Sequence, residues 1–548
     1  MTNKKIAMKK TVLLLSFLFF QAITLHAQED ALVFFQDKEN IAAALENPIS
    51  ILTQKAIDRK LLHNTAIDAR DVPVNEAYIT AIKDISGITV FAKSKWMNCV
   101  YVRADLQSLE ALEGLDFVSH VEFANKSLNL APIIGGPIED KFLIENQTNS
   151  IVYDYGAATN QVEMIAANFL HQQDFTGTGV DIAVLDSGFP GVLTNPAFET
   201  ILDQGRLLGT YNFITREESA DTSSSHGSKT FSDIGGYLEN EFVGTAPGAS
   251  FYLYVTEDVT QENPVEEAWW VEALERSDSL GVSLVNTSLG YQDYDNPAYT
   301  HSYEDLDGFT TIAARGANHA FDKGMLLLTS AGNDGQSFGF VATPADAPGC
   351  LSIGAVDQDG IYAGFSSFGP NSSGLRKPDV MAQGVSAAVV DQNGAVDFNS
   401  GTSFSSPIMA GAIASLWQSR PEATNTQIMQ IIRASAHLFD NPTDFMGYGI
   451  PNFETAYNAL QILGAQTDFL EIQFAMYPNP ARDIVSFNIP SAIEKAQVSV
   501  FTISGQKVFS SEITPNQNTI DISGVASGIY IAKVKSGNTK NSFKLIKK

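Results

Sequence analysis

Cysteine is scarce in this chain of 548 residues, since Cys99 and Cys350 are the only two. So few cysteines exclude the disulfide-dense scaffold of a small secreted domain, and no Cys or His spacing matches a structural zinc site. We therefore expect two buried thiols and no metal site built on cysteine.

Positive charge is also in short supply. The sequence has 34 Lys and Arg against 62 Asp and Glu, which gives a formal net charge of −28. Binding to nucleic acid requires a basic face, and so does adhesion to an anionic membrane surface. The charge therefore argues against nucleic acid as the main partner and against a peripheral membrane role.

Long apolar runs are missing except near the N-terminus. Four lysines at positions 4, 5, 9 and 10 precede an apolar run from Thr11 to Leu25, and Ala27 follows it closely. A basic start, a short apolar run and a small residue at its end are typical of a secretory signal peptide, here residues 1–27. The alternative is an N-terminal anchor helix, although the run is short for one. We expect no transmembrane segment elsewhere.

What is present divides into three parts. Hydrophobic residues make up 44% of the sequence, which allows large cores. Residues 28–150 predict a small α+β domain that ends in a polar linker over Asn125–Ser150. Its expected strands and helices are Ala31–Phe35, Ile79–Ile85, Val100–Val102, Leu106–Leu112 and Val118–Phe123, in the order β, α, β, α, β.

Residues 151–465 alternate short apolar strands with longer helices, which predicts an α/β domain with a parallel sheet and helices on both faces. The expected strands are Val180–Leu185, Ser250–Val255, Ser283–Asn286, Met325–Thr329 and Leu351–Ala355. Helices are expected after His226, at Pro264–Leu280 and Thr310–Lys323, after Ser403, and at Asn425–Ala436. Residues 470–548 instead carry six short strand patterns separated by turns, which predicts a small all-β sandwich.

Polar residues follow the strands of the middle part. Asp186 ends an apolar strand, and Asn333 follows another within Ser330–Gly335. His226 precedes a predicted helix. In parallel sheets, chemistry gathers at the carboxyl ends of the strands. Each residue also has a structural explanation, as a turn-capping Asp or Asn or as a core histidine.

Ser403 lies in Asn399–Pro407, just before an apolar pattern with helical spacing. It should therefore sit at a helix N-terminus, where free backbone N–H groups favour negative charge. Pro407 is expected in the first turn, where its missing N–H costs little. An N-cap serine is the structural alternative.

Together, these segments resemble the subtilisin family. The order Asp, His, Ser with a separate Asn is the order found there. The resemblance covers residues 177–452 and includes five supporting stretches: Gly244–Ala249, Ser288–Gly290, Phe365–Pro370, Lys377–Val380 and Gly447–Gly449.

The resemblance implies a role for each residue. Ser403 would be the nucleophile, His226 its general base and later acid, and Asp186 the group that orients the imidazole. Asn333 and the Ser403 backbone N–H would hold the oxyanion.

The resemblance also implies a substrate-binding edge, in which Ser288, Leu289 and Gly290 pair with the backbone of a protein or peptide substrate. The implied activity is that of a secreted serine endopeptidase made as a zymogen. A catalytically inactive surface-binding protein with the same fold is the alternative, and the four intact residues argue against it.

Two positions depart from the family pattern. Gly227-Ser228-Lys229 stands where Gly-Thr-His is usual, and Gln383 replaces a proline. They leave the reaction class intact and put local packing and substrate preference in doubt. A rival motif, Gly335-Gln336-Ser337-Phe338-Gly339, matches the elbow of esterases, but its strand ends too early and only His437 follows it.

The flanking parts resemble known segments as well. Residues 28 to about 150 are similar in size and pattern to a subtilisin propeptide, with removal expected between Asn125 and Val152; a permanent accessory domain is the alternative. Residues 470–548 resemble the C-terminal sorting domain of type IX secretion cargo in Bacteroidetes, carried by Tyr477–Ala481, Ile503–Gly505, Asp521–Val525, Gly528–Tyr530 and Lys544–Lys548. An adhesion or carbohydrate-binding sandwich is the alternative.

The type IX resemblance implies export across the outer membrane, to the cell surface or the medium, with the secretion machinery as a partner. The implied chemistry requires no cofactor. A structural calcium ion is one reading of the acidic stretch Tyr291–Asp307, because hard oxygen ligands suit calcium. Its spacing matches no defined calcium loop, which favours a solvated acidic loop.

Overall fold

The computed structural model describes residues 28–129, 153–470, 475–477, 481–488, 495–502, 506–514, 518–536 and 539–548. The predicted signal peptide and most of the predicted linker lie outside these residues. The chain divides into two compact units, one of which extends to Tyr457 and the other over the remainder. Within the described residues, no helix is long and apolar enough to cross a membrane.

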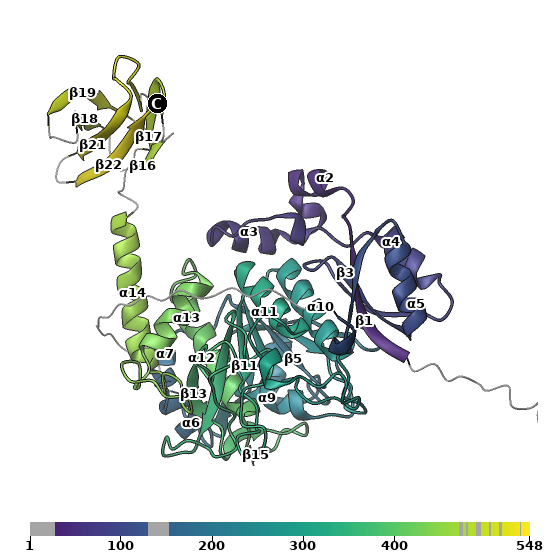
Figure 1. The fold of residues 1–548 in the computed structure, drawn as a ribbon. Helices are drawn as coiled ribbons and strands as arrows, with labels where there is room; N and C mark the ends of the chain where they lie inside the picture. Colours follow the sequence, from purple (N-terminus) through teal and green to yellow (C-terminus); the bar gives the residue numbers. More distant parts are fainter. Residues whose placement is uncertain are drawn as a thin grey trace, which may run out of the picture. The chain divides into compact units, whose positions relative to one another are not determined.

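The N-terminal domain is an antiparallel sheet with helices on its outer face (Figure 1). The strand order is β2-β3-β1-β4, and the predicted α+β pattern is confirmed. The elements are β1 (Gln28–Phe35), α2 (Ile41–Glu46), α3 (Gln54–Leu62), α4 (Glu76–Lys83), β2 (Thr89–Ser94), β3 (Cys99–Asp105), α5 (Leu106–Ala111) and β4 (Val118–Phe123). Prediction from the pattern missed β2, α2 and α3.

Both faces of this sheet are buried. In β1, Val33 points to a core shared with α4 and α5, whereas its neighbour Leu32 belongs to a core formed with the next domain. This alternation follows from the two-residue period of a strand. Tyr101 of β3 joins Leu32 in the second core, against helices α10 (Val265–Leu280) and α11 (Ile312–Asp322). The N-terminal domain therefore uses the larger domain as part of its hydrophobic core.

The larger domain contains a seven-stranded, all-parallel sheet in the order β13-β12-β11-β10-β5-β9-β6. Its strands are β5 (Asp181–Asp186), β6 (Leu207–Asn212), β9 (Ser250–Val255), β10 (Leu284–Thr287), β11 (Leu326–Ser330), β12 (Cys350–Val356) and β13 (Val380–Gln383). The five predicted strands are confirmed, and β6 and β13 complete the two edges. Short hairpins add β7 (Tyr237–Leu238) with β8 (Phe242–Val243), and β14 (Ala387–Val390) with β15 (Val396–Asn399).

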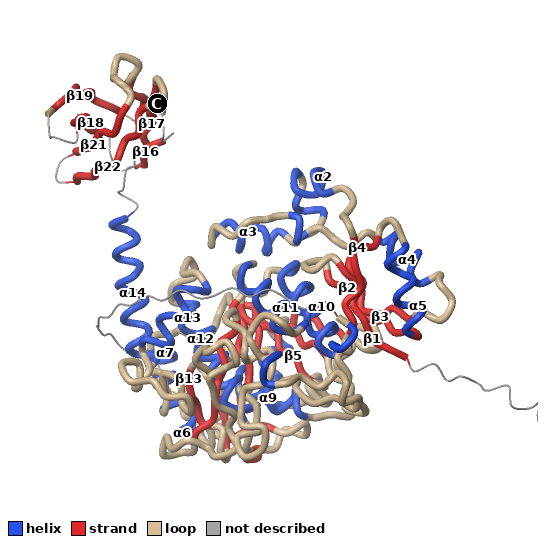
Figure 2. The backbone as a smooth tube through the Cα atoms, viewed as in Figure 1, coloured by secondary structure: helices blue, strands red, loops and turns tan. Residues whose placement is uncertain are grey.

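Helices cover both faces of the sheet, as predicted (Figure 2). The helices α9 (His226–Gly235) and α12 (Thr402–Gln418) pack together, and so do α10 (Val265–Leu280) and α11 (Ile312–Asp322). The other helices are α6 (Thr159–Glu163), α7 (Ala167–Gln172), α8 (Glu199–Asp203), α13 (Asn425–Ala434) and α14 (Phe453–Leu470). Both cysteines are free and buried, as expected.

The C-terminal unit consists of two sheets around one core. One sheet has the order β16-β17-β20 and the other β19-β18-β21-β22. Val485 and Ile520 of the first sheet share a core with Val498 and Val534 of the second, which is the arrangement of the predicted sandwich. The strands are β16 (Ala475–Tyr477), β17 (Ile484–Asn488), β18 (Ala496–Thr502), β19 (Lys507–Ile513), β20 (Thr519–Asp521), β21 (Gly528–Ser536) and β22 (Thr539–Lys547).

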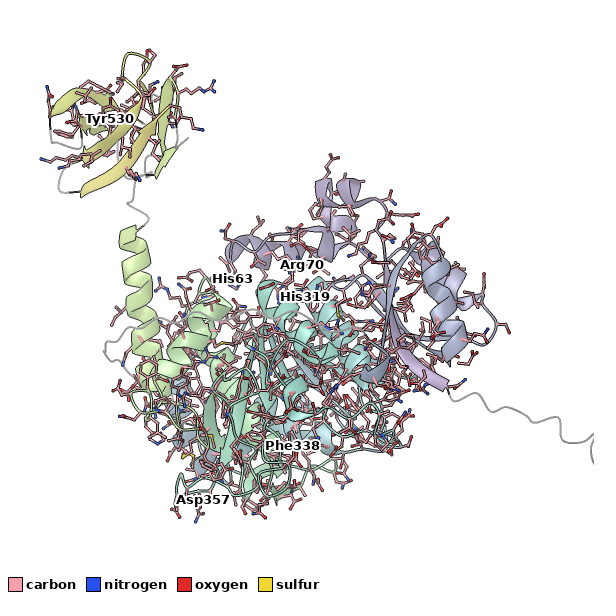
Figure 3. All side chains as sticks on the ribbon, in the orientation of Figure 1. His63, Arg70, His319, Phe338, Asp357 and Tyr530 are labelled. Carbon is pink, nitrogen blue, oxygen red and sulfur yellow. The ribbon has the colours of Figure 1, made fainter. Side chains whose placement is uncertain are left out.

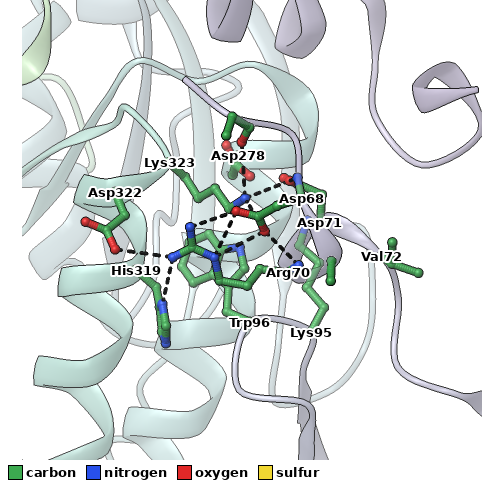
Figure 4. A network of polar contacts seen from close by, with 12 residues as sticks. Asp68, Arg70, Asp71, Val72, Lys95, Trp96, Asp278, His319, Asp322 and Lys323 are labelled. Carbon is green, nitrogen blue, oxygen red and sulfur yellow. Dashed lines mark hydrogen bonds and ion pairs between the residues drawn. The ribbon is translucent and has the colours of Figure 1, made fainter. Parts of the chain in front are cut away.

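The segment Thr53–Asp71 of the N-terminal domain contacts the larger domain through buried ion pairs (Figure 4). We call this segment the clasp. Lys60 Nζ lies 2.8 Å from Asp278 Oδ1 and 3.3 Å from Asp71 Oδ1. Lys323 Nζ lies 2.7 Å from Asp71 Oδ2. All four side chains are fully buried.

Two other residues of the clasp, His63 and Arg70, make further contacts with the larger domain. The His63 ring stacks on Trp417, and its Nε2 lies 2.8 Å from the Pro421 carbonyl oxygen. Arg70 contacts His319 and Asp322, which both lie on α11 (Figure 3). The clasp therefore attaches to three separate parts of the larger domain.

Candidate active site

Asp186 is the last residue of β5 and is completely buried. Its Oδ1 accepts hydrogen bonds from His226 Nδ1 at 2.8 Å and from the Ser187 backbone N–H at 2.7 Å. Its Oδ2 accepts one from Thr230 Oγ1 at 3.0 Å. These bonds satisfy both oxygens of a buried carboxylate and hold it in one orientation toward the imidazole.

His226 is the first residue of α9, and its side chain is one-third exposed. The negative charge of Asp186 raises the pKa of the imidazole, against the opposing effect of burial. Nδ1 faces Asp186, and the ring centroid of Phe404, at the start of α12, lies 5.9 Å from that of the imidazole. Gly227 allows the start of α9 to lie this close to Asp186, since a Cβ at position 227 would lie only 2.9 Å from the Cβ of Asp186.

Ser403 is the second residue of α12, so the expectation of a helix N-terminus is confirmed. The expected position of Pro407 is wrong, because the proline lies in the second turn. A proline there removes the hydrogen bond to the carbonyl oxygen four residues earlier, which is that of Ser403. Ser288 Oγ donates to that oxygen instead, at 2.8 Å.

Ser288 and Ser403 are thus joined in both directions. The Ser403 hydroxyl donates to the Ser288 carbonyl oxygen at 3.3 Å. Within the described residues, no hydrogen bond joins Ser403 to His226. Catalytic hydrogen bonds are often long in unliganded enzymes and shorten when substrate binds. The structure therefore places Ser403 and His226 at adjoining helix N-termini, with the Ser403 hydroxyl turned toward Ser288.

Asn333 follows β11 and is exposed. Its Oδ1 accepts from the backbone N–H of Thr402 at 2.9 Å and from the Thr402 hydroxyl at 3.0 Å. The amide is therefore tied directly to the residue before Ser403. With Oδ1 occupied in this way, Nδ2 is the end available for donation.

Ser288, Leu289 and Gly290 continue from the carboxyl end of β10 toward the surface. Ser288 is buried, Leu289 half-buried and Gly290 exposed. The Leu289 carbonyl oxygen accepts from Thr329 Oγ1 at 3.3 Å. The segment therefore runs from Ser288, which is bonded to Ser403, to the exposed Gly290.

Other expected features fall outside this cluster. Ser337 of the rival esterase motif lies in an exposed turn, where its backbone N–H donates to Asp334 O at 2.8 Å, and no helix follows. This excludes the strand–turn–helix elbow. Gln383 accepts a hydrogen bond from Asn160 Nδ2 at 2.7 Å, so the substituted position joins β13 to α6.

The acidic stretch engages its carboxylates with other groups of the protein. Asp307 accepts from two backbone N–H groups, and Asp305 pairs with Lys126 of the N-terminal domain at 2.7 Å. Among the residues that the structure describes, no three His, Cys, Asp or Glu side chains gather as metal ligands.

Prediction from the sequence missed the groups that support the cluster. Thr230 lies one helical turn after His226 and orients Asp186. Asn286 accepts from Ser406 Oγ at 2.8 Å and so ties β10 to α12. The i, i+4 spacing of His226 and Thr230 on a helix was a usable signal, whereas the Asn286–Ser406 contact depends on the tertiary fold.

Three segments of the chain match known families. Residues 30–138 match the peptidase S8 propeptide domain of Bacteroidota, residues 177–452 the Subtilase family, and residues 475–548 the secretion system C-terminal sorting domain.

Two subtilisins agree with the central match. Subtilisin NAT from Bacillus subtilis subsp. natto is 28% identical over 340 residues, which cover 61% of this chain and 78% of that protein. Subtilisin Savinase from Lederbergia lenta is 27% identical over 297 residues, or 54% of this chain and 97% of that one. The solved structure of the MycP3 protease from the type VII (ESX-3) secretion system is 18% identical, with a TM-score of 0.47, and covers 60% of this chain and 98% of its own. Because the Subtilase match takes in half of the chain, the protein belongs to the subtilase family of serine endopeptidases.

Proposed function

We propose that Asp186, His226 and Ser403 form the catalytic triad and that Asn333 stabilises the oxyanion. The observation that carries this proposal is the buried Asp186, which holds His226 Nδ1 at 2.8 Å beside the helix that begins at Thr402. The proposal is tested by asking whether a serine-directed fluorophosphonate labels Ser403.

The reaction follows from these positions. With Nδ1–H donated to Asp186, the unprotonated Nε2 is the base. The Ser403 hydroxyl rotates from the Ser288 carbonyl to Nε2 and loses its proton as its oxygen bonds to the scissile carbonyl carbon. His226 then passes that proton to the leaving nitrogen as the C–N bond breaks. Water repeats the two steps on the acyl ester, which restores Ser403 and releases the acid product.

The oxyanion would be held by the Ser403 backbone N–H and Asn333 Nδ2. Replacement of Asn333 by alanine is expected to lower kcat by about 10²–10³-fold with little change in KM, because the lost donor acts mainly on the transition state. Steady-state hydrolysis of an extended peptide amide measures both constants. Thr402→Val is the matched control: it keeps the backbone N–H that orients Asn333 and should reduce kcat much less. An equal fall in both variants, or a rise in KM alone, would contradict this role.

Ser288, Leu289 and Gly290 are proposed to bind the substrate backbone as an added strand, ending at the scissile bond. The exposed backbone of this segment and its double link to Ser403 support the assignment. Protein and peptide chains in extended form are the implied substrates.

The matched propeptide domain indicates a zymogen. We propose that the segment between Asn125 and Val152 is cut and that residues 28 to about 150 keep Ser403 from substrate until then. The extensive shared core of the two domains supports a tight complex before the cut.

The matched sorting domain indicates secretion or a cell-surface location. We propose the type IX machinery as the partner that reads residues 470–548, after a signal peptide at residues 1–27 has directed the chain across the inner membrane. Deletion of residues 470–548 is expected to leave the protein in the cell envelope, as measured by immunoblots of cell and medium fractions. Full-length Ser403→Ala, which loses activity but keeps the sorting domain, should be exported at the normal level. Normal export of the truncated chain would contradict the assignment.

A further inference from the structure

Lys229 occupies a position where the chain departs from the family pattern. Its contacts join α9, which begins at His226, to β15, which leads into Ser403. It lies three residues after His226 on α9. Its Nζ donates to Asn399 Oδ1 at 2.9 Å and lies 3.5 Å from Asp397 Oδ2. Asn399 ends β15, four residues before Ser403.

We propose that Lys229 is a positioning residue that ties the helix of the base to the strand leading into the nucleophile, and that its charge acts on His226. The inference rests on the proposed triad.

The link is a small polar network rather than one surface ion pair. Asn399 Nδ2 donates to Asp397 Oδ2 at 3.0 Å, so both partners of Lys229 are themselves joined. The Lys229 side chain is only one-fifth exposed, whereas that of Asp397 is half exposed. Asn399 pairs with Ala387 of β14 in the hairpin register. The ammonium therefore fixes the end of this hairpin to α9 immediately before the chain enters Gly401 and Ser403.

The same geometry sets the charge around His226. Residues three apart on a helix have Cβ atoms about 5–6 Å apart, so the ammonium lies within electrostatic range of the imidazole. The charged groups that act on His226 are Asp186 from β5, which raises its pKa, and Lys229 from α9, which lowers it. From α12, the neighbours Ser403 and Phe404 carry no charge. On the hairpin side, Asp391 and Asp397 face Lys229 and partly offset its charge.

The sign of the effect follows. A positive neighbour disfavours the imidazolium ion, so Lys229 keeps His226 in its basic form at a lower pH than Asp186 alone would allow. Removing the charge should raise the pKa of His226. The acid limb of kcat/KM, which reports the free enzyme's base, should then move to higher pH.

The test measures pH profiles of kcat/KM on the matured enzyme with an extended peptide amide. Lys229→Met and Lys229→Gln should both move the acid limb upward by roughly 0.5–1 pH unit at low salt, and less at high salt. Lys229→Gln keeps a donor for Asn399, so it should retain more of the wild-type kcat than Lys229→Met. Lys229→Arg keeps the charge and should leave the limb in place.

Asp397→Asn provides an independent arm at an exposed position. It leaves the charge of Lys229 less compensated, so the acid limb should move to lower pH, opposite to Lys229→Met. If Lys229→Met fails to mature, this variant carries the test.

The inference is overturned if the acid limb of kcat/KM stays in place in both Lys229→Met and Lys229→Gln, or in Asp397→Asn. It is also overturned if Lys229→Arg moves the acid limb as far as the two neutral variants do. Lack of activity in the wild-type enzyme would instead refute the triad, so the two failures are distinguishable.

Discussion

Ser403→Ala and His226→Ala are each expected to lower kcat by about 10⁶-fold, and the double variant should be no slower than either single one. The reason is that nucleophile and base act as one unit: without the base the hydroxyl is too weak, and without the hydroxyl the base has nothing to activate. Hydrolysis of an extended peptide amide gives the rates. The N-terminal domain is first removed with a cysteine protease, which a thiol reagent then blocks.

The control for folding is Ser337→Ala, which removes the serine of the exposed turn and should keep wild-type kcat. Residual catalysis of about 10³–10⁴-fold over the uncatalysed reaction should remain in the triad variants, supplied by the oxyanion donors and by binding. If the loss of kcat in the double variant equals the product of the two single losses, Ser403 and His226 act independently, and the triad is refuted.

Asp71→Asn is expected to raise the dissociation constant of the complex between the cleaved N-terminal domain and the enzyme by at least about 100-fold. Asp71 lies between the buried ammonium groups of Lys60 and Lys323, at 3.3 and 2.7 Å. Removing one partner of a buried pair leaves charge uncompensated and costs about 3–5 kcal/mol. The lower end applies here because Asp278 and Asp68 still contact the two lysines, and 3 kcal/mol corresponds to about two decades in dissociation constant.

The measurement is the recovery of activity on dilution after the linker has been cut. Because Asp71 leaves with the N-terminal domain, the matured enzyme is identical in both cases, and its kcat and KM provide an internal control. Glu76→Gln breaks an exposed pair with Lys93 in the same domain and should have no measurable effect. Equal dissociation constants for Asp71→Asn and wild type would show that the clasp contributes nothing to retention.

Much of the site could be predicted from the sequence. Asp186 and Ser403 each stand at the border of a strong apolar pattern, and local rules place such residues at a strand end and a helix start. The predicted strand Val180–Leu185 and the observed Asp181–Asp186 differ by one residue. Each residue alone could be a cap or a core residue, and the order of the polar segments along the chain is what favours a catalytic site.

The clasp and the Lys229 network could not be predicted, because their patterns contradict the usual rules. Helix α3 buries Arg59 and Lys60 and exposes Leu61 and Leu62, so its hydrophobic periodicity points to the wrong face. Asp278, which contacts both Arg59 and Lys60, lies more than 200 positions away along the chain. Lys229 likewise meets Asn399 across 170 residues. Partners so distant become neighbours only through the fold.

The most direct test of the triad is mass spectrometry of the matured protein after treatment with a fluorophosphonate. We expect a single modified serine, Ser403, with labelling that disappears in Ser403→Ala and slows strongly in His226→Ala. A matured protein that takes up no probe, or that takes it up on another serine such as Ser337, would refute the proposed triad.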